Sequence, residues 1–219
     1  MADIDKLLEG FQRFRKRYFE TDRALYQRLT QQGQSPKTLM IGCSDSRVDP
    51  AIITDTDPGD LFVVRNVANL VPPCDTGGAY HGTSAALEFA VCHLKVANIV
   101  VLGHARCGGI KALLESEGSV PPNQGFIAPW VNMAARARDR VLGRWPEAGK
   151  EFQQRACERA SILVSLDNLM TFSFVSQRAE AGQLQLYGWY FDLENGELMQ
   201  YDPQTGRFHD LYDRLRGDL

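Results

Sequence analysis

Hydrophobic side chains recur every three or four residues near the start of the chain, which is the spacing of one face of a helix. The stripe runs through residues 4–30 and includes Phe11 and Tyr18. Thr21 and Asp22 are residue types that often begin helices, so we expect a break between two helical segments there. The stripe is long for a helix that packs only on its own domain, and it therefore predicts N-terminal helices that extend to a partner subunit.

Further along, short apolar runs alternate with segments of helical periodicity, which is typical of buried strands alternating with helices. We expect strands at residues 38–42, 61–64, 98–102, 183–191 and 197–201, the last two joined by a hairpin turn at Asn195-Gly196. We expect helices at residues 83–95, 108–117, 127–142 and 152–169. This alternation predicts an α/β fold, with a mainly parallel central sheet flanked by helices on both faces and an antiparallel strand at one edge.

Length and composition fit a single domain. The chain has 219 residues, of which 44% are hydrophobic and 23% are charged, as in ordinary globular proteins. No internal repeat or low-complexity tract divides it. We expect one domain over residues 1–219, with an N-terminal helical dimerisation segment at residues 1–33 and a core at residues 34–203.

Charge and cysteine content argue against several classes of protein. The net charge of −3 gives no reason to expect nucleic acid or an anionic membrane as a partner. No apolar run approaches the ~20 residues that cross a bilayer, and the first residues lack the pattern of a secretory signal. Five irregularly spaced cysteines argue against a disulfide framework and for a reducing compartment, with the cytoplasm as the expected location.

Metal-ligating side chains follow two of the predicted buried strands. Cys43 follows the strand at residues 38–42, and His104 and Cys107 follow the strand at residues 98–102. Ligands bind outside the carboxyl ends of parallel strands, so the three side chains converge if these strands are neighbours. Two thiolates and one imidazole suit zinc, and three protein ligands leave a fourth position for water. The pattern predicts a catalytic zinc site.

Parts of this pattern have simpler explanations when each is taken alone. A single buried cysteine is usually a small hydrophobic residue, and we expect Cys74, Cys92 and Cys157 to be of that structural kind. Asp45 and Arg47 follow Cys43 closely. Asp45 could orient a hydroxide on the metal with the help of Arg47, or the two could form an ordinary ion pair or an Asx turn. The sequence leaves both interpretations open.

Several segments resemble the signature blocks of β-class carbonic anhydrases, and of their plant-like branch in particular. They are IGCSDSR at residues 41–47, FVVRNVAN at 62–69, GTSAALEF at 82–89, GHARCGG at 103–109 and GWYFD at 188–192. The resemblance extends over about residues 34–203, and its combination of C-x-D-x-R with H-x-x-C is highly specific. It implies zinc-dependent, reversible hydration of carbon dioxide to bicarbonate and a proton, by attack of zinc-bound hydroxide.

The resemblance also implies a substrate pocket and an oligomer. Gln34 would donate a hydrogen bond to a substrate oxygen, Phe62, Val67 and Phe89 would form apolar walls, and Gly108 would let the backbone approach closely. Phe89 stands where the plant-like branch has Tyr. The family forms dimers or multiples of dimers, so we expect a homodimer or a dimer of dimers in which the N-terminal helices embrace the partner.

Two alternatives to this function stay open. The same fold and zinc ligands serve hydrolases of carbonyl sulfide or carbon disulfide, so the ligands alone do not identify the substrate. A non-catalytic zinc-binding module is the second alternative, and it predicts a damaged Asp45–Arg47 pair, whereas both residues are present here.

One departure from related sequences bears on regulation. In an allosteric bacterial branch, the counterpart of Asp45 moves onto the zinc at low pH, supported by a bicarbonate pocket of Trp, Arg and Tyr side chains. Arg65 and Tyr190 could supply the last two here, but Met40 replaces the Trp and has no N–H donor. We therefore expect Asp45 to stay paired with Arg47 near neutral pH.

Overall fold

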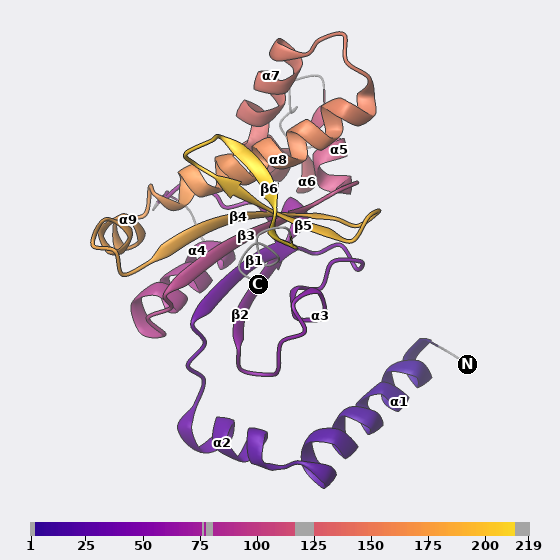
Figure 1. The fold of residues 1–219 in the computed structure, drawn as a ribbon, viewed down its shortest axis with the longest axis vertical. Helices are drawn as coiled ribbons and strands as arrows, with labels where there is room; N and C mark the ends of the chain where they lie inside the picture. Colours follow the sequence, from indigo (N-terminus) through magenta and orange to yellow (C-terminus); the bar gives the residue numbers. More distant parts are fainter. Residues whose placement is uncertain (1–2, 76, 78–80, 117–124, 213–219) are drawn as a thin grey trace. The chain divides into compact units, whose positions relative to one another are not determined.

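The structure, a computed structural model, describes residues 3–75, 77, 81–116 and 125–212 (Figure 1). The chain forms two compact units, Met1–Ser35 and Pro36–Leu219. This division lies close to the expected boundary between an N-terminal helical segment and a core, while the dimerisation role of the first unit stays a prediction. None of the helices in the described residues is long and apolar enough to cross a membrane.

The first unit consists of α1 (Asp3–Arg15), a π-helical turn η1 (Lys16–Thr21) and α2 (Ala24–Gln32). The predicted break is confirmed. It lies between η1 and α2, where the carboxylate of Asp22 accepts a hydrogen bond from the N–H of Ala24 at 3.0 Å. The rings of Phe14, Tyr18 and Tyr26 pack together, with centroids 5.1–5.6 Å apart.

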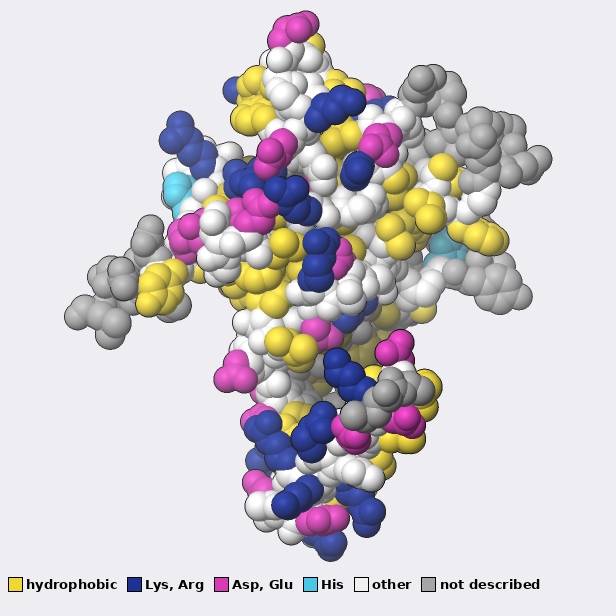
Figure 2. Space-filling view, turned by 90° about the vertical axis from the view of Figure 1, so that its right-hand side faces the viewer, with side chains coloured by type: hydrophobic (Ala, Val, Ile, Leu, Met, Phe, Trp, Pro, Cys, Tyr) yellow, Lys and Arg dark blue, Asp and Glu magenta, His cyan; other side chains and the backbone are white. Residues whose placement is uncertain are grey.

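The apolar stripe of α1 is not covered within this unit. None of the described residues of the first unit is buried. Ile4, Leu7, Leu8 and Phe11 are each more than half exposed. Hydrophobic and basic side chains lie together on the N-terminal helices at the bottom of Figure 2. Exposed apolar groups on a helix that cannot cross a membrane are typical of a protein–protein contact.

The second unit is built on a six-stranded sheet in the order β2-β1-β3-β4-β5-β6. Its strands are β1 (Thr38–Cys43), β2 (Leu61–Asn66), β3 (Asn98–His104), β4 (Gln185–Asp192), β5 (Glu197–Asp202) and β6 (Arg207–Asp210). The first four strands run parallel, β5 pairs antiparallel with β4, and β6 pairs antiparallel with β5. The predicted α/β fold is confirmed. Strand β6 was not predicted, because four residues of mixed polarity carry no clear period.

Helices connect and flank these strands (Figure 1). They are α3 (Pro50–Ile53), η2 (Val67–Asn69), α4 (Gly82–Glu88), η3 (Phe89–His93), α5 (Gly108–Glu115), α6 (Ile127–Val131), η4 (Asn132–Ala134), α7 (Ala135–Arg144), α8 (Lys150–Leu169) and α9 (Ser173–Glu180). The four helical segments predicted from periodicity are present, although that at 83–95 is divided into α4 and η3 and ends at His93, and that at 127–142 is divided into α6, η4 and α7. Glu117, the last residue expected in the helix at 108–117, lies outside the described residues. Helices α3 and α9 were not predicted.

Alternate residues of the parallel strands enter different core clusters. Leu39 and Ile41 of β1 join a large cluster with residues of α4, η3, α8 and α9, whereas Met40 joins a smaller one with Val100 and with Ile53 of α3. Both faces of β1 and β3 are buried, and the sequences of these strands are therefore nearly continuous apolar runs. A third cluster, of residues from α5, α6, α7 and α8, surrounds the carboxyl ends of β1 and β3.

Candidate metal centre

Cys43, His104 and Cys107 meet where strands β1 and β3 end. The two strands are parallel neighbours, Cys43 is the last residue of β1, and His104 is the last residue of β3. Cys107 caps helix α5 with an extended backbone, at φ −70° and ψ 120°. One ligand atom from each of the three residues lies within 4.8 Å of the other two, and all three residues are buried. The convergence expected from strand order is therefore present.

The imidazole of His104 is oriented for a ligand. Its Nδ1 lies 2.8 Å from the carbonyl oxygen of Ala105. A carbonyl can only accept, so Nδ1 carries the proton and the lone pair is on Nε2. Nε2 is buried and has no partner among the described residues. A buried nitrogen acceptor without a donor is unfavourable unless a proton or a metal ion satisfies it.

The environment shifts the pKa values of the two thiols in opposite directions. A hydrogen bond from the Cys107 thiol lowers the pKa of Cys43 against the opposing effect of burial. The same hydrogen bond and burial raise the pKa of Cys107. Burial disfavours charge on His104, but the nearby Cys43 and the carbonyl of Ala105 outweigh this effect and raise the pKa of the imidazole. A thiolate facing an imidazole and a second thiol fits the donor set that zinc prefers.

Asp45 and Arg47 form a bidentate ion pair beside Cys43. Arg47 donates from Nε to Asp45 Oδ1 at 2.9 Å and from Nη2 to Asp45 Oδ2 at 2.7 Å. The N–H of Arg47 also donates to Oδ1 at 3.0 Å, which is the geometry of an Asx turn. The hydrogen bond from Arg47 is the main reason that the pKa of Asp45 lies well below its usual range. The carboxylate is therefore ionised and held in one orientation.

Arg65 holds the loop that carries this pair, and the sequence alone did not indicate such a role. It donates to the carbonyl oxygen of Cys43 at 2.8 Å, to that of Asp45 at 2.7 Å and to the carboxylate of Asp49 at 2.8 Å. Asp49 in turn caps α3 by accepting from the N–H groups of Ala51 and Ile52. Arg65 follows an apolar run on β2, and a charged residue directly after such a run was the available signal.

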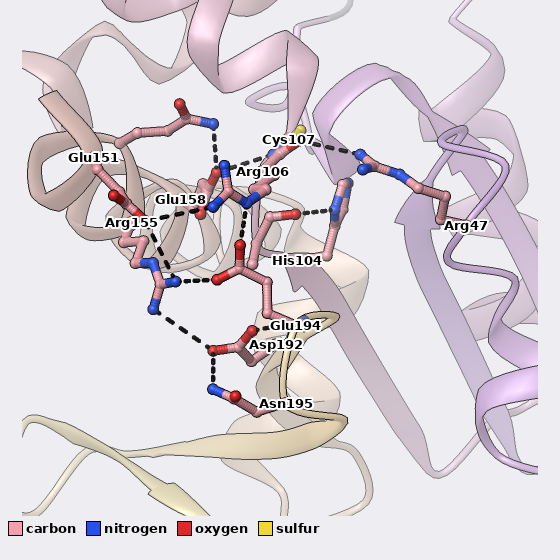
Figure 3. A network of polar contacts seen from close by, with 12 residues as sticks. Arg47, His104, Arg106, Cys107, Glu151, Arg155, Glu158, Asp192, Glu194 and Asn195 are labelled. Carbon is pink, nitrogen blue, oxygen red and sulfur yellow. Dashed lines mark hydrogen bonds and ion pairs between the residues drawn. The ribbon is translucent and has the colours of Figure 1, made fainter.

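Glu158 is a second residue that the sequence did not single out. It lies on α8, is 1% exposed, and accepts from the N–H of Cys107 at 2.9 Å. It also accepts from Gln154 at 2.9 Å and from the hydroxyl of Tyr190 at 2.9 Å. Figure 3 shows this side chain reaching toward Cys107. Burial raises the pKa of Glu158, and the three hydrogen bonds oppose that shift.

The contact with Glu158 bears on the bicarbonate pocket considered from the sequence. Tyr190 is fully buried, and its hydroxyl donates to Glu158. Arg65 donates from Nε and both terminal nitrogens to the loop that follows β1. The Tyr190 hydroxyl and these nitrogens of Arg65 are therefore already engaged by other parts of the protein.

The predicted substrate residues fall into separate groups. Val67 on η2 lies against Gly109, since a Cβ on that glycine would be 2.8 Å from Val67 Cγ1. Gly108 is the first residue of α5, directly after Cys107. Phe62 and Phe89 stack on one another with centroids 5.8 Å apart. Gln34 lies in the first unit, so its position relative to the metal centre is not described.

The remaining cysteines lack ligand partners among the described residues. Cys157 is buried, Cys92 is partly buried and Cys74 is exposed. Burial raises the pKa of the Cys157 thiol to about 12, which keeps it protonated near neutral pH. None belongs to the group of possible metal ligands found in the described residues.

Known proteins that are similar to this chain in sequence and fold include carbonic anhydrases. A family model described as carbonic anhydrase matches residues 38–198. A curated carbonic anhydrase from Synechocystis sp. is 38% identical over 208 residues, which cover 95% of this chain and 73% of that protein.

Solved structures agree. The β-carbonic anhydrase CcaA matches with a TM-score of 0.88 and 37% identity, covering 96% of this chain and 92% of that chain. A tetrameric β-carbonic anhydrase from Sordaria macrospora matches with a TM-score of 0.72 and 28% identity, covering 90% of this chain and 92% of that one. The chain therefore belongs to the β class of the carbonic anhydrase family and is a carbonic anhydrase.

Proposed function

We propose that this enzyme hydrates carbon dioxide reversibly to bicarbonate and a proton at a zinc ion held by Cys43, His104 and Cys107. The observation that carries the proposal is the buried Nε2 of His104, which has no hydrogen-bond partner in the described part of the chain although the residue lies in a tight group with two thiols. Such an arrangement of one imidazole and two sulfurs suits zinc and leaves one coordination position open. Bound zinc would supply a Lewis acid that lowers the pKa of water, so that hydroxide is available near neutral pH.

The chain's own residues would orient the reaction. Asp45 stays ionised because Arg47 donates to both of its oxygens, so Asp45 can only accept a hydrogen bond. It would accept a hydrogen bond from the attacking hydroxide and thereby direct a lone pair of the hydroxide oxygen toward the carbon of carbon dioxide. Two thiolates cancel the charge of the metal, which makes this orientation by a neighbouring carboxylate more important.

We propose that a second copy of the chain completes the substrate pocket. Asn66 of β2 lies beside the metal ligand Cys43. Phe62 lies four residues before Asn66, so at ~3.3 Å per residue Phe62 is about 13 Å along the strand from the level of Cys43. Phe62 is therefore too far away to form a wall at the metal centre of its own chain, and Phe89 stacks on Phe62. Phe89 is 43% exposed and Val67 is 38% exposed. A homodimer, or a dimer of dimers, could bring the Phe62–Phe89 pair and Gln34 of one copy to the zinc of the other.

We propose that the enzyme works in a reducing compartment, with the cytoplasm as the proposed location, because its cysteines are thiols. All five cysteines are free, and a thiolate site for zinc is available only while its cysteines remain reduced.

Metal analysis and stopped-flow hydration of carbon dioxide test the function. We expect one zinc per chain, and loss of both zinc and turnover in Cys107→Ala. Cys74→Ala is the matched control, because Cys74 is exposed, and it should keep both. Full zinc content and turnover in Cys107→Ala would contradict the assignment. Hydrolysis of carbonyl sulfide, measured in parallel, should be slower than hydration of carbon dioxide.

A further inference from the structure

A pocket beside helix α8 joins basic and aromatic side chains. It lies between α7, α8 and the β5–β6 hairpin and has a volume of about 410 Å³. Four arginines line it: Arg140 and Arg144 from α7, and Arg155 and Arg159 from α8. None of the described residues that line it is acidic. Basic side chains lie next to hydrophobic ones in the upper part of Figure 2, which holds these helices.

Three of these arginines have no carboxylate partner among the described residues. Arg140 and Arg144 are exposed and make no ion pair there, although they stand four residues apart on one helix. Like charges at this spacing repel each other. The guanidinium of Arg159 lies 4.7 Å from the centre of the Tyr190 ring, and its buried Nε finds no acceptor within the described part of the chain. Arg155 differs, because Glu194, Glu151 and Asp192 neutralise it (Figure 3).

Aromatic rings form the other part of the wall. Trp145 and Phe152 pack edge to face with centroids 5.3 Å apart, and the guanidinium of Arg144 lies 4.8 Å from the centre of the Trp145 ring. Both rings are partly open to solvent, at 37% and 49% exposure. An arginine held over a ring offers its N–H edge to an anion, while the neighbouring ring faces can stack on a flat group.

We propose that this pocket binds a small organic anion that carries a phosphate or carboxylate group and an aromatic ring. The uncompensated guanidinium groups suit the anionic oxygens, and the Trp145–Phe152 pair suits the ring. The volume falls within the range of about 300–1,000 Å³ that is usual for small-molecule sites. The site is separate from the metal centre and does not depend on the proposed reaction.

Calorimetric titration of the zinc-loaded enzyme with AMP tests this proposal, because AMP joins an aromatic ring to a phosphate. We expect saturable binding at one site per chain, and at least ten-fold weaker binding in the double variant Arg140→Gln, Arg144→Gln. Both side chains are exposed, so the fold should survive. The matched control is Arg136→Gln, Lys111→Gln, which removes the same charge from exposed ion pairs outside the pocket and should leave the affinity within two-fold.

Three outcomes would overturn the proposal. One is an absence of saturable binding, including the case in which a second copy covers the pocket in solution. Another is an equal loss of affinity in the control variant, which would indicate attraction by overall charge alone. The third is binding of adenosine or of inorganic phosphate that is as tight as binding of AMP. This result would exclude a site that recognises both the ring and the anion.

Discussion

At the scale of single residues, Asp45 depends on Arg47 for both its charge and its orientation. We expect Asp45→Asn and Arg47→Ala to keep zinc, because neither side chain belongs to the ligand group. Turnover should fall ~10–100-fold, as is typical when a group that orients a metal-bound species is lost. Zinc content and stopped-flow hydration, measured on the same preparations, check this.

The control for these variants is the surface pair Arg136–Asp167, whose nitrogen and oxygen lie 3.8 Å apart. Arg136→Ala and Asp167→Asn should leave turnover unchanged. Wild-type turnover in both Asp45→Asn and Arg47→Ala would show that the Asp45–Arg47 pair is only a structural ion pair.

The low pKa of Asp45 also predicts the pH dependence. Its ionised form is favoured in the folded protein, so the pair stabilises the fold above about pH 4, the ordinary pKa of Asp, and this stability is lost only as the pH falls further. Asp45 should therefore not titrate between pH ~6.5 and ~9. We expect a single-proton profile for hydration across that window, which includes the titration of zinc-activated water.

Added bicarbonate distinguishes this expectation from a regulated state. Met40 offers no donor, and the hydroxyl of Tyr190 donates to Glu158, so bicarbonate should not change the shape of the profile. A steep, cooperative collapse of turnover on acidification, deepened by bicarbonate, would show that Asp45 leaves Arg47 after all.

Glu158 acts on Cys107 through the backbone rather than on the metal. In Glu158→Leu the buried N–H of Cys107 loses its acceptor, which should cost about 1–3 kcal/mol of unfolding free energy. For a chain of this length, that corresponds to a Tm lower by roughly 2–12 °C. Glu158→Gln keeps an acceptor oxygen for the Cys107 N–H and should lose clearly less. Thermal unfolding and zinc affinity of the two variants provide the test, and equal losses in both would argue against the hydrogen bond.

At the scale of secondary-structure elements, glycines let α8 lie close to the sheet. A Cβ at Gly103 on β3 would be 2.7 Å from Ile162 Cδ1, and one at Gly188 on β4 would be 2.9 Å from Ile162 Cγ2. Real Cβ atoms do not approach other atoms so closely, so an alanine at either position would move Ile162 or the helix. The same helix carries Glu158 to Cys107, and the distance between α8 and β3 therefore affects the metal centre.

Gly103→Ala tests this arrangement. Overpacking of a buried contact costs about 1–3 kcal/mol, and zinc affinity should fall with stability because His104 is the next residue. Gly143→Ala on α7 is the control, because a Cβ there meets nothing within 4 Å, and it should stabilise the helix by roughly 0.5–1 kcal/mol. Urea unfolding measures the stability of both variants. Unchanged stability in Gly103→Ala would mean that α8 shifts without a loss of unfolding free energy.

At the scale of the whole molecule, the N-terminal unit presents apolar side chains that no described residue buries. We expect the double variant Ile4→Glu, Leu7→Glu, whose positions are 63% and 67% exposed, to shift the enzyme toward monomers and to lower turnover. The control Gln12→Glu, Gln32→Glu adds the same charge at positions that are already polar. Analytical ultracentrifugation and hydration assays compare the two.

Removal of the segment before Gln34 is a more severe version of the same test. The truncated chain should be insoluble or inactive, because it lacks the surface proposed to hold the partner. A soluble, active and monomeric truncation would contradict the proposed dimer.

The sequence by itself determined the parallel sheet and the convergence of Cys43, His104 and Cys107. Strands buried on both faces leave continuous apolar runs, and the carboxyl ends of neighbouring parallel strands meet at one edge. These are local patterns with a fixed geometric consequence. The helical stripe at residues 4–30 and its break at Asp22 could be recognised for the same reason.

Only the tertiary structure decided which distant residues support that site. The N–H of Cys107 meets Glu158, which is 51 residues away, and Arg65 reaches the carbonyl of Cys43 across 22 residues. Strand β6 forms because β5 offers a free edge, and its own four residues carry no period. Such contacts depend on how elements pack, and packing between segments far apart in the chain leaves no periodic signal in either segment.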